Sequence, residues 1–192
     1  MTSPSQTQTR SPAFAAAFDT AQATLLAPYA LDDNALQQVF GQILAHKVDY
    51  ADLYFQYSRS EGWSLEEGIV KSGSFNIDQG VGVRTVAGEK TAFAYSDDIS
   101  LPALTAAAQA TRAIARQGAD NKTQVAQRGT GRNLYLPHDP LASLADGDKV
   151  KLLEKLERYA RQIDARISQV MASLAGEYEV MTCEMRASIW RA

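Results

Sequence analysis

One stretch of the sequence decides the fold, and residues 49–95 read DYADLYFQYSRSEGWSLEEGIVKSGSFNIDQGVGVRTVAGEKTAFAY. Apolar and polar residues alternate along much of it, which is the two-residue period of a strand with two unlike faces. The alternation predicts consecutive antiparallel strands around residues 53–57, 63–70, 75–83 and 92–95. Residues 87–90 contain Gly88 and are typical of the short link that closes a hairpin.

Outside this stretch, helices dominate the prediction. The first two are expected at residues 13–27, ended by Pro28, and at 34–46, capped by Asp32 or Asp33. Two more are expected at residues 101–117, capped by Ser100 and ended by Gly118, and at 148–166, with a long loop over 118–145 between them. Residues 168–175 and 178–182 are predicted to be strands joined at Gly176 and Glu177.

This order of elements predicts an α+β fold with helices packed on one face of an antiparallel sheet, a mixed sheet being the alternative. The two later helices should cover the same face and bury their apolar stripes. These stripes are Leu104, Ala108 and Ile114 on one helix, and Leu153, Leu156 and Ile163 on the other.

Charge and cysteine content limit the class of protein. The 192 residues include 19 basic and 22 acidic side chains, a formal net charge of −3 without long runs of one sign. Direct DNA or RNA binding is therefore not expected, because it requires a basic stripe. The single cysteine, Cys183, fits a reducing compartment. Residues 1–12 are polar and predicted to be disordered, and no apolar stretch approaches a membrane span, so we expect a cytoplasmic protein without a membrane partner.

Few residues could hold a metal ion or act as a nucleophile. A catalytic zinc takes about three protein ligands, usually with two histidines one helical turn apart. The histidines here are His46, near the end of a predicted helix, and His138, in a loop, and Cys183 is the remaining soft ligand. Only a tertiary coincidence would join the three, and Cys183 has Glu184 rather than a histidine beside it. No metal or catalytic residue is assigned.

The glycines Gly80 and Gly82 do not predict a nucleotide site. A dinucleotide-binding turn follows a strand and opens a helix, whereas these glycines lie inside a run that continues as strand. Close approach of another backbone, or a bulge, explains them better. No cofactor-binding residue is assigned.

The remaining candidates for functional residues are acidic and aromatic. The carboxylate pairs Asp32/Asp33, Glu66/Glu67 and Asp97/Asp98 are interpreted as caps and solvated turns. Asp78 is the most unusual polar residue of its strand, and a turn or edge role is favoured over a catalytic one. Most aromatic residues of the strand region are expected in the core. If the face that bears Tyr54 lacks a helical cover, it is a candidate protein-contact surface.

The segments DYADLYFQ, GIVKSGSFNIDQGVGVR and GEKTAFAYSDDIS resemble the amino-terminal domain of the TldD/PmbA family of zinc metallopeptidases, also described as modulators of DNA gyrase. The resemblance covers about residues 31–180, so 13–180 is expected to be the family's amino-terminal α+β domain. It implies a complete protein that cleaves small or unfolded polypeptides with a zinc ion held by a His-Glu-x-x-x-His helix in a carboxy-terminal domain. That motif does not occur here, so none of its residues can be carried over.

The resemblance implies a scaffold or assembly role without catalysis of its own, alongside a PmbA/TldE-like subunit or a second copy. Whether the chain is an enzyme stays open: the family is a hydrolase, but this chain alone is predicted to be inactive. The alternative is a stand-alone module that binds such a subunit, or a polypeptide, without cleavage. Residues 181–192 diverge from the family, and we expect the chain to be truncated before the metal site. Direct modulation of gyrase is disfavoured by the charge.

Overall fold

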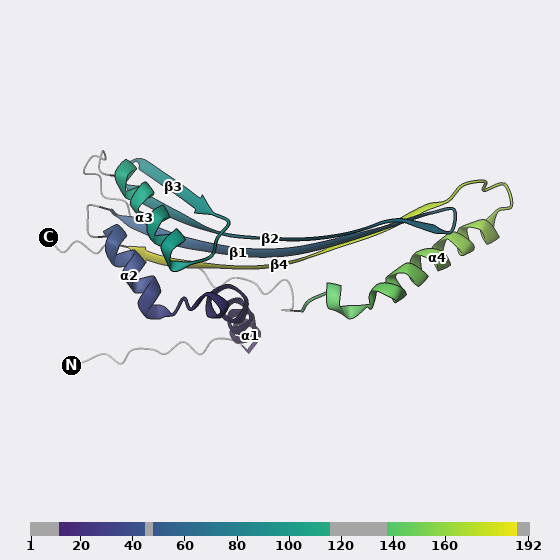
Figure 1. Ribbon diagram of the computed structural model, residues 1–192, viewed down its shortest axis with the longest axis horizontal. Helices are drawn as coiled ribbons and strands as arrows, with labels where there is room; N and C mark the ends of the chain where they lie inside the picture. Colours follow the sequence, from purple (N-terminus) through teal and green to yellow (C-terminus); the bar gives the residue numbers. More distant parts are fainter. Residues whose placement is uncertain (1–11, 45–47, 116–137, 188–192) are drawn as a thin grey trace. The chain divides into compact units, whose positions relative to one another are not determined.

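The computed structural model describes residues 12–44, 48–115 and 138–187 (Figure 1). Its elements are α1 (Pro12–Ala21), the π turn η1 (Gln22–Leu26), the 3-10 turn η2 (Ala27–Tyr29), α2 (Asp33–Leu44), β1 (Tyr50–Glu66), β2 (Ile69–Ala87), β3 (Lys90–Ser96), α3 (Leu101–Ala115), the 3-10 turn η3 (Leu141–Ser143), α4 (Asp146–Ile163) and β4 (Met171–Ala187). The strands form one sheet in the order β3-β2-β1-β4. No helix within the described ranges is long and apolar enough to cross a membrane.

Tight hairpin turns join the first three strands. Glu67 and Gly68 connect β1 to β2 with φ angles of 54° and 73°. Positive φ at both central residues matches the twist of the flanking strands, and glycine adopts it without steric cost. Gly88, with φ of 60°, lies in the turn between β2 and β3, as predicted.

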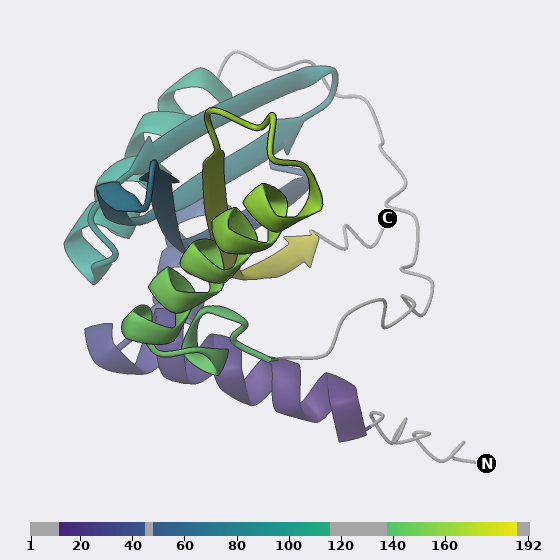
Figure 2. The ribbon, with the colours of Figure 1, turned by 90° about the vertical axis from the view of Figure 1, so that its right-hand side faces the viewer.

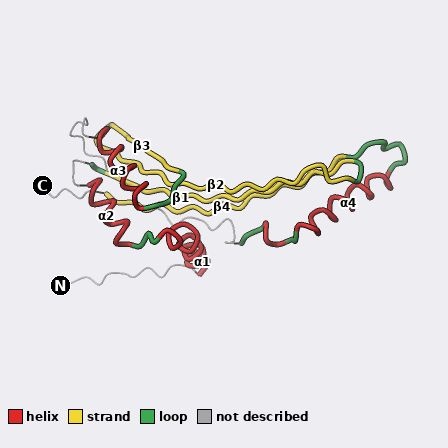
Figure 3. The backbone as a smooth tube through the Cα atoms, viewed as in Figure 1, coloured by secondary structure: helices red, strands yellow, loops and turns green. Residues whose placement is uncertain are grey.

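The last strand, β4, lies beside β1 and runs antiparallel to it. Gln56 on β1 donates a side-chain hydrogen bond to Glu179 on β4, whereas Tyr54, two residues earlier, contacts Met181, two residues later. Figure 3 shows β1, β2 and β4 as neighbouring strands. The predicted α+β class with an antiparallel sheet is confirmed.

Two predictions about strands were wrong. Residues 49–95 form three strands rather than four, because β1 continues without a break to Glu66. Its polar residues have ion-pair partners elsewhere, Arg59 with Asp139 and Glu61 with Lys149, so the strand continues where apolar alternation fails. Residues 168–182 do not form two strands, since β4 runs unbroken from Met171 through the predicted turn to Ala187.

The described chain divides into two compact units, and β1, β2 and β4 contribute residues to both. The first unit comprises residues 12–44, 48–55, 80–115 and 181–187. In it α3 packs against β3 and α2. Its core includes Val39, Ile43, Leu53, Phe55, Val83 and Leu104, all buried.

The predicted caps of this unit are confirmed. Asp32 Oδ1 accepts a hydrogen bond from the Ala35 N–H at 2.8 Å, and Ser100 Oγ accepts one from the Ala103 N–H at 3.3 Å. Each cap satisfies one of the backbone donors that the first turn of a helix leaves unpaired. Gly118, the predicted end of α3, lies outside the described residues, as do residues 118–137 of the predicted loop and residues 1–11 of the predicted disordered tail.

The second unit comprises residues 56–79 and 138–180. It contains parts of β1, β2 and β4, with η3 and α4. The buried residues of α4 are Lys149, Leu153 and Glu157, which are spaced four apart and so follow one line along the helix. Figure 2 views α4 in front of the strands of its unit.

The predicted burial of the α4 stripe was wrong in two of three positions. Leu153 is buried, but Leu156 is 49% exposed and Ile163 is 67% exposed. The side chains of Lys149 and Glu157 lie on the buried line, where Lys149 pairs with Glu61 and Glu157 pairs with Arg161. On α3, Leu104 and Ala108 are buried as predicted, and the Ile114 side chain lies outside the description.

Candidate functional site

The second unit contains a groove beside the first turn of α4. It measures about 400 Å³ and is lined by Glu61, Trp63, Gly73, Ser74, Phe75 and Asp146. We refer to these six residues as the acidic–aromatic groove. They come from β1, β2 and α4.

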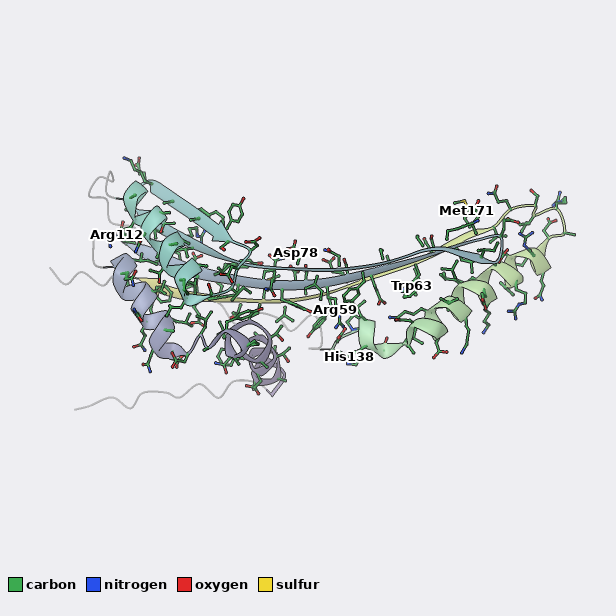
Figure 4. All side chains as sticks on the ribbon, viewed as in Figure 1. Arg59, Trp63, Asp78, Arg112, His138 and Met171 are labelled. Atoms are coloured by element: carbon green, nitrogen blue, oxygen red, sulfur yellow. The ribbon has the colours of Figure 1, made fainter. Side chains whose placement is uncertain are left out.

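Strand alternation explains how the groove is built. A Cβ on Gly73 would lie 3.1 Å from the Trp63 ring, so Gly73 and Trp63 share one face of the sheet. Glu61 and Phe75 are two residues from Trp63 and Gly73, respectively, and therefore share it too. Figure 4 shows Trp63 and Arg59 on the side where α4 lies and Asp78 on the other side. The absence of a side chain at Gly73 leaves room for the indole ring.

The groove carries excess negative charge. The Lys149 ammonium lies 2.6 Å from Glu61 Oε1 and 3.4 Å from Asp146 Oδ1, and it also donates to the Leu141 carbonyl at 3.1 Å. The hydrogen bond to Glu61 raises the pKa of Lys149 above its usual value of 10.5, so the ammonium stays charged. Two carboxylates share this one cation, and the Asp146 side chain is 71% exposed. One negative charge is therefore left facing the solvent.

A second ion pair joins β1 to the segment that precedes η3. Arg59 Nη2 donates to Asp139 Oδ2, and Asp139 Oδ1 accepts from the Leu141 N–H at 3.0 Å. Two enclosed donors, Arg59 Nε and Trp63 Nε1, find no acceptor among the described residues. Burial, followed by the charge of Asp139, raises the pKa of the nearby Tyr178.

The first unit holds a separate polar cluster on β1 and β2. Asp52 is 5% exposed, and its Oδ2 accepts a hydrogen bond from Arg84 Nε at 2.7 Å. The Arg84 guanidinium also lies 5.6 Å from the centre of the Tyr50 ring. Burial and the Asp52 charge raise the pKa of Tyr50, while the bond to Asp52 raises that of Arg84. The cluster satisfies a buried carboxylate, which otherwise would be costly.

The sequence-predicted candidates are not brought together as a metal site. His46 lies outside the described residues, His138 is exposed ahead of η3, and Cys183 is a half-buried residue of β4 that forms no disulfide. Within the described ranges no three residues among His, Cys, Asp and Glu are grouped to hold a metal ion. The residues described do not fit a zinc centre, so no metal chemistry is placed on them.

The predicted close approach of another backbone is confirmed at Gly80, whereas the nearest atoms at Gly82 belong to a side chain. A Cβ on Gly80 would lie 2.8 Å from the Ser96 carbonyl oxygen, and one on Gly82 would lie 2.9 Å from the Phe93 ring. Both glycines face β3 within the sheet. Neither opens a helix, which a dinucleotide turn requires.

Asp32 and Asp98 act locally, whereas Glu66 and Glu67 bind residues that are distant in sequence. Asp98 Oδ2 accepts from the Ser100 hydroxyl at 2.7 Å, which fits a turn. Glu67 does more than predicted: its carboxylate accepts from Arg161 at 2.8 Å and from the Val170 N–H at 3.1 Å. Glu66 accepts from Gln169 at 2.8 Å.

The expectation that most strand aromatics lie in the core was wrong. Phe55 is buried, but Phe75 is 63% exposed, Phe93 58% and Tyr95 80%. Phe93 and Tyr95 stack with ring centroids 6.3 Å apart. Sequence alternation identifies which residues share a face, but not whether another layer covers that face. The groove was missed for this reason.

Comparisons with known proteins now identify the fold. Residues 51–115 match the family described as PmbA/TldA metallopeptidase domain 1. The chain is 45% identical over 159 residues to the metalloprotease TldD homolog of Haemophilus influenzae, covering 81% of this chain and 33% of that protein. It is 41% identical over 134 residues to the TldD homolog of Buchnera aphidicola subsp. Schizaphis graminum, covering 70% and 28%. The chain thus spans about a third of the length of these relatives.

Solved structures agree on the fold. A protein described as a modulator of DNA gyrase from Bacteroides thetaiotaomicron matches with a TM-score of 0.61 at 16% identity, over 79% of this chain and 36% of that one. TldE from Thermococcus kodakarensis matches with a TM-score of 0.56 at 16% identity, over 78% and 34%. The chain therefore carries a first domain of the PmbA/TldD metallopeptidase family. Within that family, the curated relatives named here are TldD homologs, and the predicted resemblance is confirmed.

Proposed function

We propose that this chain is the amino-terminal scaffold and assembly domain of a TldD-like zinc metallopeptidase, and that it does not itself carry out hydrolysis. The observation that carries this is the 45% identity to a TldD homolog, which is confined to 33% of that protein's length. The sequence also contains no His-Glu-x-x-x-His string. Zinc, the peptide substrate and the cytoplasmic location are proposed for the complete protein on the same basis.

The proposed partner is a PmbA/TldE-like subunit. The likeness to a TldE structure supports a shared fold, and exposed apolar side chains on both units provide surface for contact. The alternative, a module that binds such a subunit or a polypeptide without cleavage, rests on the same surfaces. The two candidates differ in whether a complete peptidase contains this domain.

The first test measures metal, activity and assembly on the purified chain. We expect no stoichiometric zinc and no cleavage of an unfolded polypeptide, because the described residues offer no ligand cluster. Mixing with a TldE-like subunit should give a complex in sedimentation velocity. One tightly bound zinc ion per chain together with hydrolysis would contradict the proposal. Hydrolysis that appears when the part of a TldD relative outside the matched region is supplied in trans would favour the scaffold role over the module.

A further inference from the structure

The outer edge of β2 is open along its first half. β3 pairs with β2 only from Val81 to Ala87, so among the described strands β1 is the sole neighbour of the residues before Gly80. Every residue from 69 to 78 is exposed, on both faces of the strand. By contrast, exposed and half-buried residues alternate along β4 between 171 and 179. β2 thus presents a long row of backbone groups that a further strand could pair with.

Apolar side chains accompany this open edge. Ile69 is 60% exposed, Phe75 63% and Ile77 51%. Natural sheets usually protect an edge with short strands, proline, bulges or inward-pointing charges. The β2 edge contains no proline, and its charged residues are Lys71 and Asp78, which lie near its two ends. An edge with these properties matches those that accept a strand from another chain.

The acidic–aromatic groove adds chemical selectivity to the edge. Phe75 lies on the edge strand and also lines the groove, so a side chain from an added strand on the α4 face would reach it. There it would meet two aromatic rings, Trp63 and Phe75, and the exposed carboxylate of Asp146. Rings attract a cation through their faces, and a carboxylate pairs with it. Lys71, the nearest like charge on the strand, does not line the groove.

We propose that the β2 edge, Ile69–Asp78, binds an extended strand of a partner polypeptide whose Lys or Arg side chain enters the acidic–aromatic groove. Backbone pairing supplies the affinity, and the groove selects the basic residue. The occupant is a polypeptide strand rather than an amphipathic helix, because a helix satisfies its own backbone groups and would leave the edge unpaired.

The test uses fluorescein-labelled peptides and the full 192-residue chain. One peptide alternates Thr and Val over the length of the edge and carries a central Lys; a second carries Glu in its place. Two more peptides carry the Lys and are N-methylated at every second amide. The methylated amides of one are the unmethylated amides of the other. We expect the Lys peptide to bind, the Glu peptide to bind at least about tenfold more weakly, and one methylated peptide not to bind.

Matched variants locate the site. Asp146→Asn should lower the affinity for the Lys peptide several-fold. Asp148→Asn should leave it unchanged, although Asp148 is another exposed acid of the first turn of α4. Phe75→Ala should lower the affinity for every peptide that binds. Ile163→Ala should leave these affinities unchanged, since Ile163 is about 25 Å along α4 from Asp146. Phe75 and Asp146 are exposed, so both variants are expected to fold.

Several outcomes would overturn this assignment. They are equal affinity for the Lys and Glu peptides, binding unaffected by either N-methylation, no effect of Asp146→Asn, or no binding at all. Self-association that Phe75→Lys abolishes, without competition by the peptides, would instead make a second copy the occupant. Failure of peptide binding would leave the proposed scaffold role standing, because that role rests on the family relationship.

Discussion

Two glycines of β2 lie where the sheet has no room for a side chain. Gly80 and Gly82 are two residues apart, and a methyl group at either would enter occupied space. The obstacle differs, however: it is the Ser96 backbone at Gly80 and the ring of Phe93 at Gly82. Phe93 is 58% exposed and can turn away, whereas the backbone of a paired strand cannot.

This difference predicts unequal costs for the two alanine variants. Gly80→Ala should lower the free energy of unfolding by about 1–3 kcal/mol, the usual cost of overpacking. Gly82→Ala should cost less than about 1 kcal/mol, since alanine also regains roughly 0.5–1 kcal/mol relative to glycine in a strand. Urea denaturation of both variants measures this. Equal losses would show that the Phe93 ring is as fixed as the backbone.

Titration of Tyr50 gives a prediction about alkaline pH. Burial and Asp52 raise its folded-state pKa above 10.0, so the folded protein holds the phenol proton more tightly than the unfolded chain does. The resulting stability is fully present below pH 10 and is lost as pH rises through the folded pKa. Tyr50→Phe lacks this loss. Its melting temperature should therefore fall less steeply above pH 10 than that of the wild type, and the two slopes should agree near neutral pH.

Lys149 and Tyr178 also have raised pKa values, and they titrate in both proteins of that comparison. Their contribution cancels when the two slopes are subtracted. An identical alkaline slope in the wild type and in Tyr50→Phe would contradict the assigned role of Tyr50.

At the scale of elements, α4 shows how an amphipathic pattern can mislead. Its apolar residues predict one buried face, but the helix buries Lys149, Leu153 and Glu157 instead. Leu153 belongs to both patterns. Leu156, three residues later, is 49% exposed.

A pair of alanine variants tests this directly. Leu153→Ala should destabilise the protein by about 2–5 kcal/mol, because it removes a side chain that is fully enclosed. Leu156→Ala should change the free energy of unfolding by less than about 0.5 kcal/mol, as surface substitutions do. Both are measurable by urea denaturation. A large loss in Leu156→Ala would mean that this side chain is covered in solution.

The reason that the sequence could not predict the helix face is physical. Periodicity measures how apolar residues recur, whereas burial depends on what the sheet offers at each point. Here β1 offers Glu61, and the β1–β2 turn brings Glu67 to Arg161, a neighbour of Glu157. These partners are between 88 and 94 residues away in sequence and leave no local signal.

At the scale of the whole molecule, sequence reasoning predicted the class of fold, the caps of α2 and α3, the turn at Gly88 and the family. Each depends on local residues, such as a serine before a helix or a glycine in a tight link. The strand lengths and the acidic–aromatic groove could not be predicted in this way. The groove needs Trp63, Gly73 and Asp146 together, and only the hairpin and the placement of α4 produce that combination.

The distance in sequence between β1 and β4 has a consequence for synthesis on the ribosome. β1 ends at Glu66 and β4 begins at Met171, so roughly a hundred residues emerge between them. At about 5–20 residues per second, the β1–β2 hairpin waits on the order of 5–20 seconds for its second neighbour. Throughout that interval the edge of β1 that will pair with β4 is bare in the nascent chain, and a chaperone that shields it would have its greatest effect then.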